Sequence, residues 1–225
     1  MEVLRWLIIK SLYLLKLTKV YLFLFLSTLC LSQSSFFEFN EGDIIFQDLD
    51  SSPLCEGIEM VTNGYQNMNF SHVGIVTFIN DNAFVIEAYS GVDTTKINEF
   101  LLRSQDNKKP KIVVGRLKKR YQKLIPGAIY FGKKLIGKEY DYEFSIKNDK
   151  YYCSELIYEI FFRANNNKPL FNLQPMTYKV NEQTLAVWID YFDKINITIP
   201  EGEDGINPGS LSLSNKINIV YNYLD

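Results

Sequence analysis

The stretch Tyr151–Phe162, which reads YYCSELIYEIFF, decides how this chain is interpreted. Apolar residues follow Cys153 at helical spacing, at Leu156, Ile157, Ile160 and Phe161. We therefore expect an amphipathic helix whose first turn carries the cysteine. A thiol there meets the positive end of the helix dipole and unpaired backbone N–H groups, which favour a thiolate. Taken alone, the stretch better fits a cysteine that is simply part of a core, because free cysteine is commonly buried.

The composition is that of an ordinary globular protein. The chain has 225 residues, of which 47% are hydrophobic and 22% charged, and a formal net charge of −2. This length suits one domain, which we place at residues 36–225. The densest basic run, Arg116–Lys123, is interpreted as the solvated start of a helix, so nucleic acid is not an expected partner.

The amino terminus is typical of an export signal. An apolar core, Val20–Leu31, follows Lys16 and Lys19 and precedes small polar residues. We expect residues 1–32 to form a signal peptide, with the functional start at Leu15 rather than Met1. The protein would then lie in the periplasm or cell envelope of a bacterium. The alternative is a segment that is retained as a membrane anchor.

Export affects the interpretation of the cysteines. If Cys30 leaves with the signal, Cys55 and Cys153 remain. Two cysteines in an oxidising compartment can pair, so a structural Cys55–Cys153 disulfide is an alternative to a reactive thiol.

A predicted hairpin carries an imidazole and a carboxylate. Its first strand, Phe70–Ile79, contains His72, the only histidine of the chain, and its second strand, Ala83–Tyr89, contains Glu87. Side chains alternate along strands, so a two- or four-residue turn would put His72 and Glu87 on the same face, and a three-residue turn would separate them. A buried carboxylate usually has a partner.

Other elements follow from local patterns. The sequence predicts strands at Ile44–Phe46, Lys111–Leu117, Ile195–Ile199 and Lys216–Tyr223, and helices at Glu56–Thr62, Arg120–Ile136 and Glu182–Phe192. Pro126 within the second of these helices predicts a helix start or a kink there. Thr94–Arg103 fits a short helix or an irregular segment.

Cys153, His72 and Glu87 together satisfy the needs of a cysteine hydrolase. Such an enzyme uses a thiolate, an imidazole that takes and returns a proton, and a polar group that orients the imidazole. One histidine and few cysteines leave a zinc site without its usual ligands, so we expect no metal and no cofactor. Separately, His72 fits a satisfied buried histidine, and Glu87 fits a structural ion-pair partner.

Ordered short motifs add a resemblance. They are Gly42–Gln47, Ser71–Ile75, Val85–Ala88, Tyr140-Asp141 with Phe144, Tyr152–Leu156 and Gly205–Gly209. In this order the chain resembles the YiiX/YaeF-like family of permuted papain-like cysteine amidases, within a superfamily that includes cell-wall peptidases and lecithin–retinol acyltransferase relatives. The motifs cover most of residues 41–222. In that family the histidine strand precedes the cysteine helix, as it does here.

The resemblance implies a fold and a site. The expected fold is α+β, a circularly permuted papain-like domain with a small antiparallel sheet or half-barrel packed against the cysteine helix. The implied roles are Cys153 as nucleophile, His72 as general base and acid, and Glu87 as the group that orients the histidine. Tyr140 and Gln47 are implied candidates for oxyanion or substrate contacts.

We therefore expect an amidase or peptidase that forms an acyl-enzyme on Cys153. Its substrate would be a cell-envelope amide or ester, either a peptidoglycan peptide or a lipid. One alternative is a lipid ester hydrolase or acyltransferase on the same scaffold, which transfer to an amine rather than water would reveal. The other is an inactive binding module, which an unreactive Cys153 would reveal.

Overall fold

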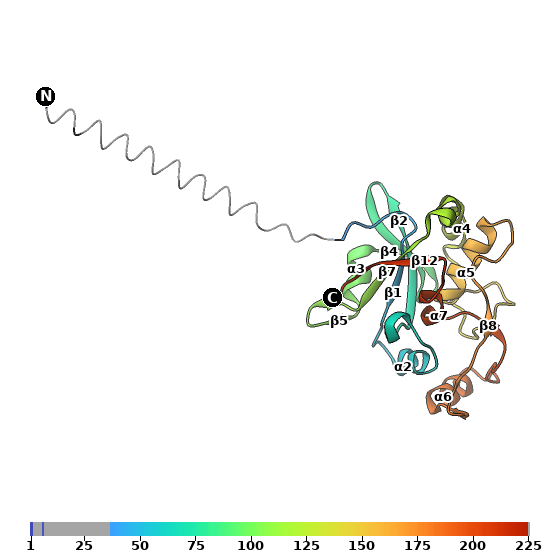
Figure 1. Cartoon of the computed structure of the whole chain (residues 1–225). Coiled ribbons are helices and arrows are strands. Elements are labelled where there is room, and N and C mark those ends of the chain that lie inside the picture. The colour runs from blue at the N-terminus through green and yellow to red at the C-terminus, as the bar shows by residue number, and fades with distance from the viewer. Residues whose placement is uncertain (2–5, 7–36, 225) are drawn as a thin grey trace. The chain divides into compact units, whose positions relative to one another are not determined.

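The computed structural model describes residues 1, 6 and 37–224 (Figure 1). The predicted signal segment, residues 1–32 with Cys30, therefore lies outside the described residues apart from Met1 and Trp6. Within the described part of the chain, no helix has both the length and the apolar character needed to cross a membrane.

A six-stranded, wholly antiparallel sheet forms the centre of the domain (Figure 1). Its spatial order is β12-β7-β1-β2-β3-β4. In chain order the strands are β1 (Ile44–Gln47), β2 (His72–Ile79), β3 (Asn82–Ala88), β4 (Val92–Lys96), β7 (Ile112–Leu117) and β12 (Ile217–Asn222). Three two-stranded pairs lie outside it: β5 (Gln105–Asp106) with β6 (Lys109–Pro110), β8 (Gln174–Pro175) with β11 (Asp204–Gly205), and β9 (Lys179–Val180) with β10 (Gln183–Thr184).

Helices connect and cover these strands. They are α2 (Pro53–Met60), α3 (Ile97–Leu102), α4 (Ile125–Leu135), α5 (Cys153–Ala164), α6 (Ala186–Lys194) and α7 (Pro208–Ser212), with 3₁₀ helices η1 (Tyr65–Asn67) and η2 (Lys119–Leu124). Pro126 stands at the start of α4, which is where its lack of a backbone N–H has no cost.

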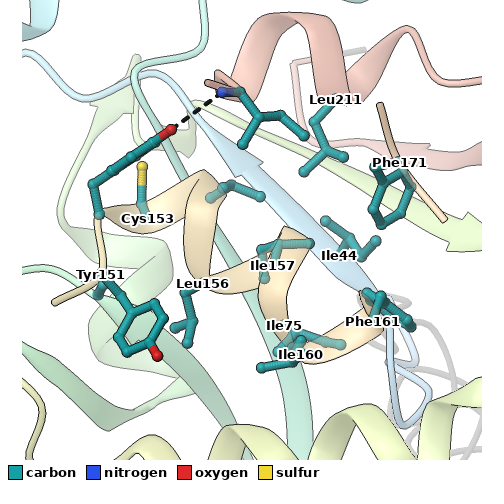
Figure 2. Close-up of a cluster of buried hydrophobic side chains, with 14 of the residues drawn as sticks. Ile44, Ile75, Tyr151, Cys153, Leu156, Ile157, Ile160, Phe161, Phe171 and Leu211 are labelled. Atoms are coloured by element: carbon teal, nitrogen blue, oxygen red, sulfur yellow. Dashed lines mark hydrogen bonds between the residues drawn. The ribbon is translucent and has the colours of Figure 1, made fainter. Parts of the chain in front are cut away.

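Helix α5 contributes an apolar stripe to the core beside the sheet. Leu156, Ile157, Ile160 and Phe161 are fully buried and lie with Ile44 and Ile75 of the sheet (Figure 2). On the next layer, Gly132 of α4 lies against Ile86 of β3 and Ile160 of α5. The amphipathic helix predicted to begin at Cys153 is confirmed, and its apolar stripe is the reason that it packs here.

The turn between β2 and β3 determines where His72 and Glu87 point. Only Asn80 and Asp81 separate the strands, and both have left-handed φ angles, 49° and 61°. The register pairs Gly74 with Glu87, so His72 and Glu87 lie diagonally on the same face. A side chain at position 74 would not fit, since a Cβ on Gly74 would lie 2.3 Å from a Val85 methyl group.

Some predicted elements are wrong. Residues 195–199 form no strand, because they directly follow α6 and are not paired with another strand. The segment predicted as a short helix or irregular, Thr94–Arg103, contains the end of strand β4 before α3 begins. β4 is the edge strand beside β3, and this long-range pairing, rather than local propensity, makes it extended.

The segment after α5 folds back over the start of that helix. The hydroxyl of Ser154 donates to the carbonyl of Ile206 at 2.8 Å, and the backbone N–H of Ile206 donates to the Tyr152 hydroxyl at 3.1 Å. These bonds fix the loop before α7 beside Cys153. The fold thus places a chain segment that is distant in sequence next to the helix start.

A buried ion pair fixes the start of β1 to β7. Asp43 is 0% exposed, and its carboxylate accepts from Arg116 at 2.7 and 2.8 Å and from the Asn40 backbone N–H at 2.8 Å. The partner raises the pKa of the Arg116 guanidinium. Because Asp43 has no access to water, its charge depends on these donors.

Replacing Arg116 with Ala should destabilise the fold by about 3 kcal/mol, because the Asp43 carboxylate would be left buried and uncompensated. Urea unfolding followed by far-UV circular dichroism measures this. The matched control is Lys119→Ala, an exposed base on the adjoining η2, which should change stability by less than about 0.5 kcal/mol. Equal midpoints for the two variants would contradict this account.

Candidate active site

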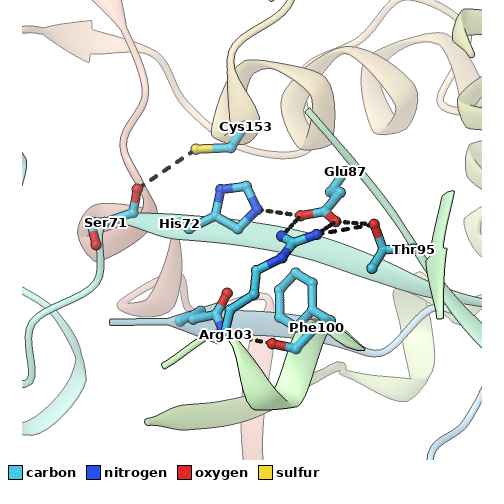
Figure 3. A network of polar contacts seen from close by, with 8 residues as sticks. Ser71, His72, Glu87, Thr95, Phe100, Arg103 and Cys153 are labelled. Carbon is cyan, nitrogen blue, oxygen red and sulfur yellow. Dashed lines mark hydrogen bonds and ion pairs between the residues drawn. The ribbon is translucent and has the colours of Figure 1, made fainter. Parts of the chain in front are cut away.

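The predicted nucleophile and base are each the first residue of an element. Cys153 begins α5 and His72 begins β2. The Cys153 Sγ lies 4.0 Å from the carbonyl oxygen of Ser71, immediately before β2. Figure 3 shows the His72 ring between the thiol and the carboxylate of Glu87. Both side chains are buried, at 5% and 4% exposure, so the pair is largely shielded from water.

Glu87 is held by three partners. His72 Nε2 lies 2.5 Å from Oε2, and Arg103 donates two bonds to the carboxylate, at 2.7 and 2.6 Å. The hydroxyl of Thr95 on β4 donates to Oε1, and the whole network is visible in Figure 3. Glu87 is 1% exposed, so its charge is balanced by these groups rather than by water.

The charges of the network follow from these contacts. Burial would raise the pKa of Glu87, but hydrogen bonds and charges from His72 and Arg103 outweigh it and lower this pKa to about 2. Burial would lower the pKa of His72, but the interactions with Cys153 and Glu87 raise it to about 9. The imidazolium form of His72 is therefore favoured at neutral pH.

Aromatic rings hold the imidazole in place. The rings of Tyr89 and Phe100 each lie 5.7 Å from the His72 ring, centroid to centroid. The Arg103 guanidinium lies 4.3 Å from the Tyr89 centroid, so the arginine is held by a ring as well as by Glu87. These contacts restrict rotation of the histidine while leaving one side of it open to Cys153.

Gln47 lies next to the histidine, but its side-chain amide donates to a different residue. It pairs directly with His72 across β1 and β2. Its Nε2 donates to the carbonyl of Phe100 at 2.8 Å, and the residue is fully buried. The amide thus fastens α3 under the histidine, and in this arrangement it points no donor at Cys153.

Tyr140 and Glu155 flank the start of α5. Tyr140 lines the same cavity as Cys153, and burial together with the nearby Cys153 raises the pKa of its phenol, which keeps the hydroxyl a neutral donor. Glu155 accepts from the Tyr152 N–H at 3.2 Å, and burial raises the pKa of its carboxyl to about 9. A protonated Glu155 places no negative charge beside the thiol.

A cavity of about 260 Å³ opens onto Cys153. Its walls come from α2, from the stretch around Tyr140 and from the segment after α5. Most of the lining is apolar or aromatic and includes Ile58, Val61, Phe144, Tyr178, Trp188 and Ile206. The site therefore has room for a bound group beside the thiol, and that room is mainly hydrophobic.

Cys55 is a free thiol in this structure, as is Cys153. It lies on α2, is 8% exposed, and its Sγ is 3.5 Å from the hydroxyls of Ser51 and Ser52. The disulfide alternative for Cys153 is not the arrangement observed here.

Arg103 and Thr95 were missed by the sequence interpretation. The signal that pointed to them was indirect, since an acid embedded in an apolar strand requires a partner. The sequence gives no means of choosing Arg103 over other bases, because the pairing depends on β4 and α3 returning beside β3.

Comparisons with known proteins agree with this fold. The chain is 31% identical over 128 residues to the uncharacterized protein YiiX of Escherichia coli strain K12, a match that spans 55% of this chain and 57% of that protein. It also resembles the crystal structure of the metalloprotein yiiX from Escherichia coli O157:H7, with a TM-score of 0.68 and 24% identity. That alignment covers 83% of this chain and 98% of the other.

The second relative corrects one expectation. The sequence led us to expect no metal partner, and a protein with this fold that is described as a metalloprotein contradicts that expectation. In residues 37–224 of this chain, no three His, Cys, Asp or Glu side chains are grouped so that they could hold a metal ion. The described side chains thus do not fit a metal centre of three such ligands.

A family match covers nearly the whole described domain. Residues 38–221 match the family described as permuted papain-like amidase enzyme, YaeF/YiiX, C92 family. The antiparallel sheet packed against the cysteine helix, with the histidine strand earlier in the chain, is the architecture expected from the resemblance. The chain therefore belongs to the YaeF/YiiX family of permuted papain-like amidases.

Proposed function

We propose that this protein is a thiol hydrolase that cleaves an amide through an acyl-enzyme on Cys153, with His72 as general base and acid and Glu87 orienting it. The observation that carries the proposal is the His72 ring, held between the Cys153 thiol and an ionised Glu87 beside an apolar cavity. An envelope location is part of the proposal and derives from the sequence of residues 1–32.

The reaction follows from the proton on His72. The Cys153 thiolate attacks the substrate carbonyl carbon, and the imidazolium gives its proton to the leaving amine as the C–N bond breaks. Neutral His72 then takes a proton from water, whose oxygen attacks the thioester. The C–S bond breaks, the carboxylic acid product leaves, and Cys153 is again a thiolate beside a protonated His72. Glu87 stays ionised throughout and stabilises the imidazolium.

Two donors are placed for the developing oxyanion. The backbone N–H of Cys153 is at the first position of α5, where no carbonyl of the preceding turn accepts it. The neutral hydroxyl of Tyr140 lines the same cavity. Gln47 is not assigned to this role, because its amide donates to Phe100.

The cavity favours an apolar acyl group over a charged peptide. Phe144, Tyr178 and Trp188 present rings, and Ile58 and Val61 present aliphatic carbons. We therefore propose a lipid amide as substrate. A lipid ester hydrolase or an acyltransferase is the second candidate, since the same walls would hold the acyl chain for transfer to another acceptor.

Replacing Cys153 with Ala should reduce amide hydrolysis by at least about 10³-fold and abolish acyl-enzyme formation, because the variant lacks the attacking sulfur. Fluorogenic aminomethylcoumarin amides and intact-protein mass spectrometry measure the two effects. Cys55→Ala is the matched control and should retain both. Full activity in the Cys153 variant would rule out this mechanism.

Glu87→Gln should move the basic limb of the kcat/KM profile to lower pH. His72 has its pKa raised to about 9 by Cys153 and Glu87, so the proton for the leaving amine is available below that pH and is lost above it. Without the carboxylate the imidazolium is less stable, its pKa falls, and activity near pH 8 drops by roughly 10²-fold.

The profile is measured between pH 5 and about 10 on an amide whose leaving group needs protonation. Glu99→Gln, an exposed carboxylate on α3, is the control and should leave the profile unchanged. Near-UV circular dichroism verifies that each variant is folded. An unmoved basic limb in a folded Glu87→Gln protein would show that Glu87 does not set the proton affinity of His72.

Ile58→Asp should weaken hydrolysis of long acyl substrates selectively, because it places a charge in the apolar cavity. The ratio of kcat/KM for a long-chain amide to that for an acetyl amide should fall by roughly tenfold or more. Met60→Asp, exposed on the same helix, should preserve the ratio. A ratio unchanged by Ile58→Asp would place the acyl group elsewhere.

A further inference from the structure

Positive charge is concentrated in one segment of the chain. Residues 108–138 contain eleven lysines and arginines and no aspartate or glutamate, although the chain as a whole has a net charge of −2. This segment comprises β7, η2 and α4 with their flanks. Such a separation of charge is not required by the fold, because these bases are mostly at the surface.

Some of these bases are neutralised within the domain. Lys111 pairs with Asp48 and Asp50, Arg116 with Asp43, and Lys138 with Asp149. Of the remaining eight, Lys108 and Lys109 belong to the β5–β6 hairpin, and the other six have no carboxylate within ion-pair distance in residues 37–224. These six, which we call the basic face, are Lys118, Lys119, Arg120, Lys123, Lys133 and Lys134.

One part of the basic face surrounds a tyrosine. The Arg120 guanidinium lies 4.7 Å from the centroid of the Tyr121 ring. The ammonium of Lys216, which directly precedes β12, lies 5.9 Å from the same centroid. The backbone of Lys118 donates to the carbonyl of Lys216 at 2.9 Å, which brings β12 to η2. Bases from two distant segments are therefore gathered around one amphipathic ring.

The other part lies along the solvent side of α4. Pro126, Tyr130, Lys133 and Lys134 are exposed at positions i, i+4, i+7 and i+8, which share one helix face. Tyr130 is 57% exposed, and Lys134 lies 5.7 Å from its ring centroid. An exposed aromatic ring among unpaired bases is typical of side chains that meet a membrane interface.

The start of the domain lies at this same end of the sheet. Ile44 pairs with Gly115, Asp43 binds Arg116, and a Cβ on Gly42 would touch the Ile125 side chain at the start of α4. In the sequence, the apolar stretch Val20–Leu31, which we expect to direct the chain to a membrane either as an export signal or as a retained anchor, precedes this point by about ten residues. The apolar stretch close to the basic face therefore favours a lipid surface over a soluble polyanion as the partner of that face.

We propose that the basic face docks onto a bilayer of anionic phospholipid. Lysine and arginine beside such a surface are attracted to its negative potential, and the attraction falls off within a Debye length. Tyr121 and Tyr130 provide rings suited to the headgroup layer. The proposal concerns a surface remote from Cys153 in sequence and does not depend on the thiol chemistry.

The test uses the full chain with phosphatidylcholine vesicles, with or without roughly one third phosphatidylglycerol. Lysine acetylation by a water-soluble reagent is followed residue by residue with mass spectrometry. With phosphatidylglycerol, acetylation of Lys119, Lys123, Lys133 and Lys134 should slow by about fivefold or more, and about 0.5 M salt should reverse this. Lys194, on α6 at the far end of the domain from α4 (Figure 1), should react at an unchanged rate.

A variant with reversed charge on the basic face provides a second test of the docking proposal. Lys119→Glu combined with Lys123→Glu should remove most of the phosphatidylglycerol-dependent protection of Lys133 and Lys134, leaving acetylation slowed by less than about twofold, whereas Lys194→Glu should preserve that protection. A near-UV circular dichroism spectrum that matches the unsubstituted protein shows that the double variant is folded. Protection that is equal on both vesicles, or that extends to Lys194, would overturn the proposal. So would protection by heparin without any by phosphatidylglycerol, which would indicate a polyanion site instead.

Discussion

The ionised carboxylate of Glu87 is the constraint on which the site depends. A charge at 1% exposure must be compensated by nearby donors, and here they come from β2, β4 and the end of α3. Arg103, Thr95 and His72 can satisfy it only if all three segments return to β3. The requirement to neutralise one charge therefore ties the proton-transfer group to the edge of the sheet, and it gives the imidazole both its orientation and its proton.

Local features of the sequence predicted only part of the centre of the domain. Helix α5 follows from apolar spacing after Cys153. The shared face of His72 and Glu87 was left open by the sequence, because it depends on the turn length, which the structure shows to be two residues, Asn80-Asp81. The partners of Glu87 could not be chosen, because Arg103 reaches it only through the β3–β4 pairing. Gln47 shows the same limit: the resemblance implied an oxyanion or substrate contact, whereas its amide donates to Phe100, a bond that depends on where α3 packs.

The proposed catalytic residues and the cavity beside them come from different parts of the fold. The thiol and the imidazole occupy the first positions of α5 and β2, regular elements in a fully buried core. The cavity beside them is walled by α2 and by the segment after α5, where prediction failed most often and the regular elements are short. The family match over residues 38–221 establishes the family, and the structural similarity to yiiX supports the architecture, whereas the walls of the cavity have to be examined in this chain itself.

His72 has one further consequence, because it is the only histidine among 225 residues. Its two ring nitrogens and two ring C–H groups generate every imidazole resonance that an untagged preparation can give in nuclear magnetic resonance. A histidine spectrum of the whole protein is therefore a spectrum of this single group. Tautomer, protonation and acyl-intermediate formation can be followed at one atom without selective labelling, and the protein carries its own spectroscopic reporter at the position where the proton moves.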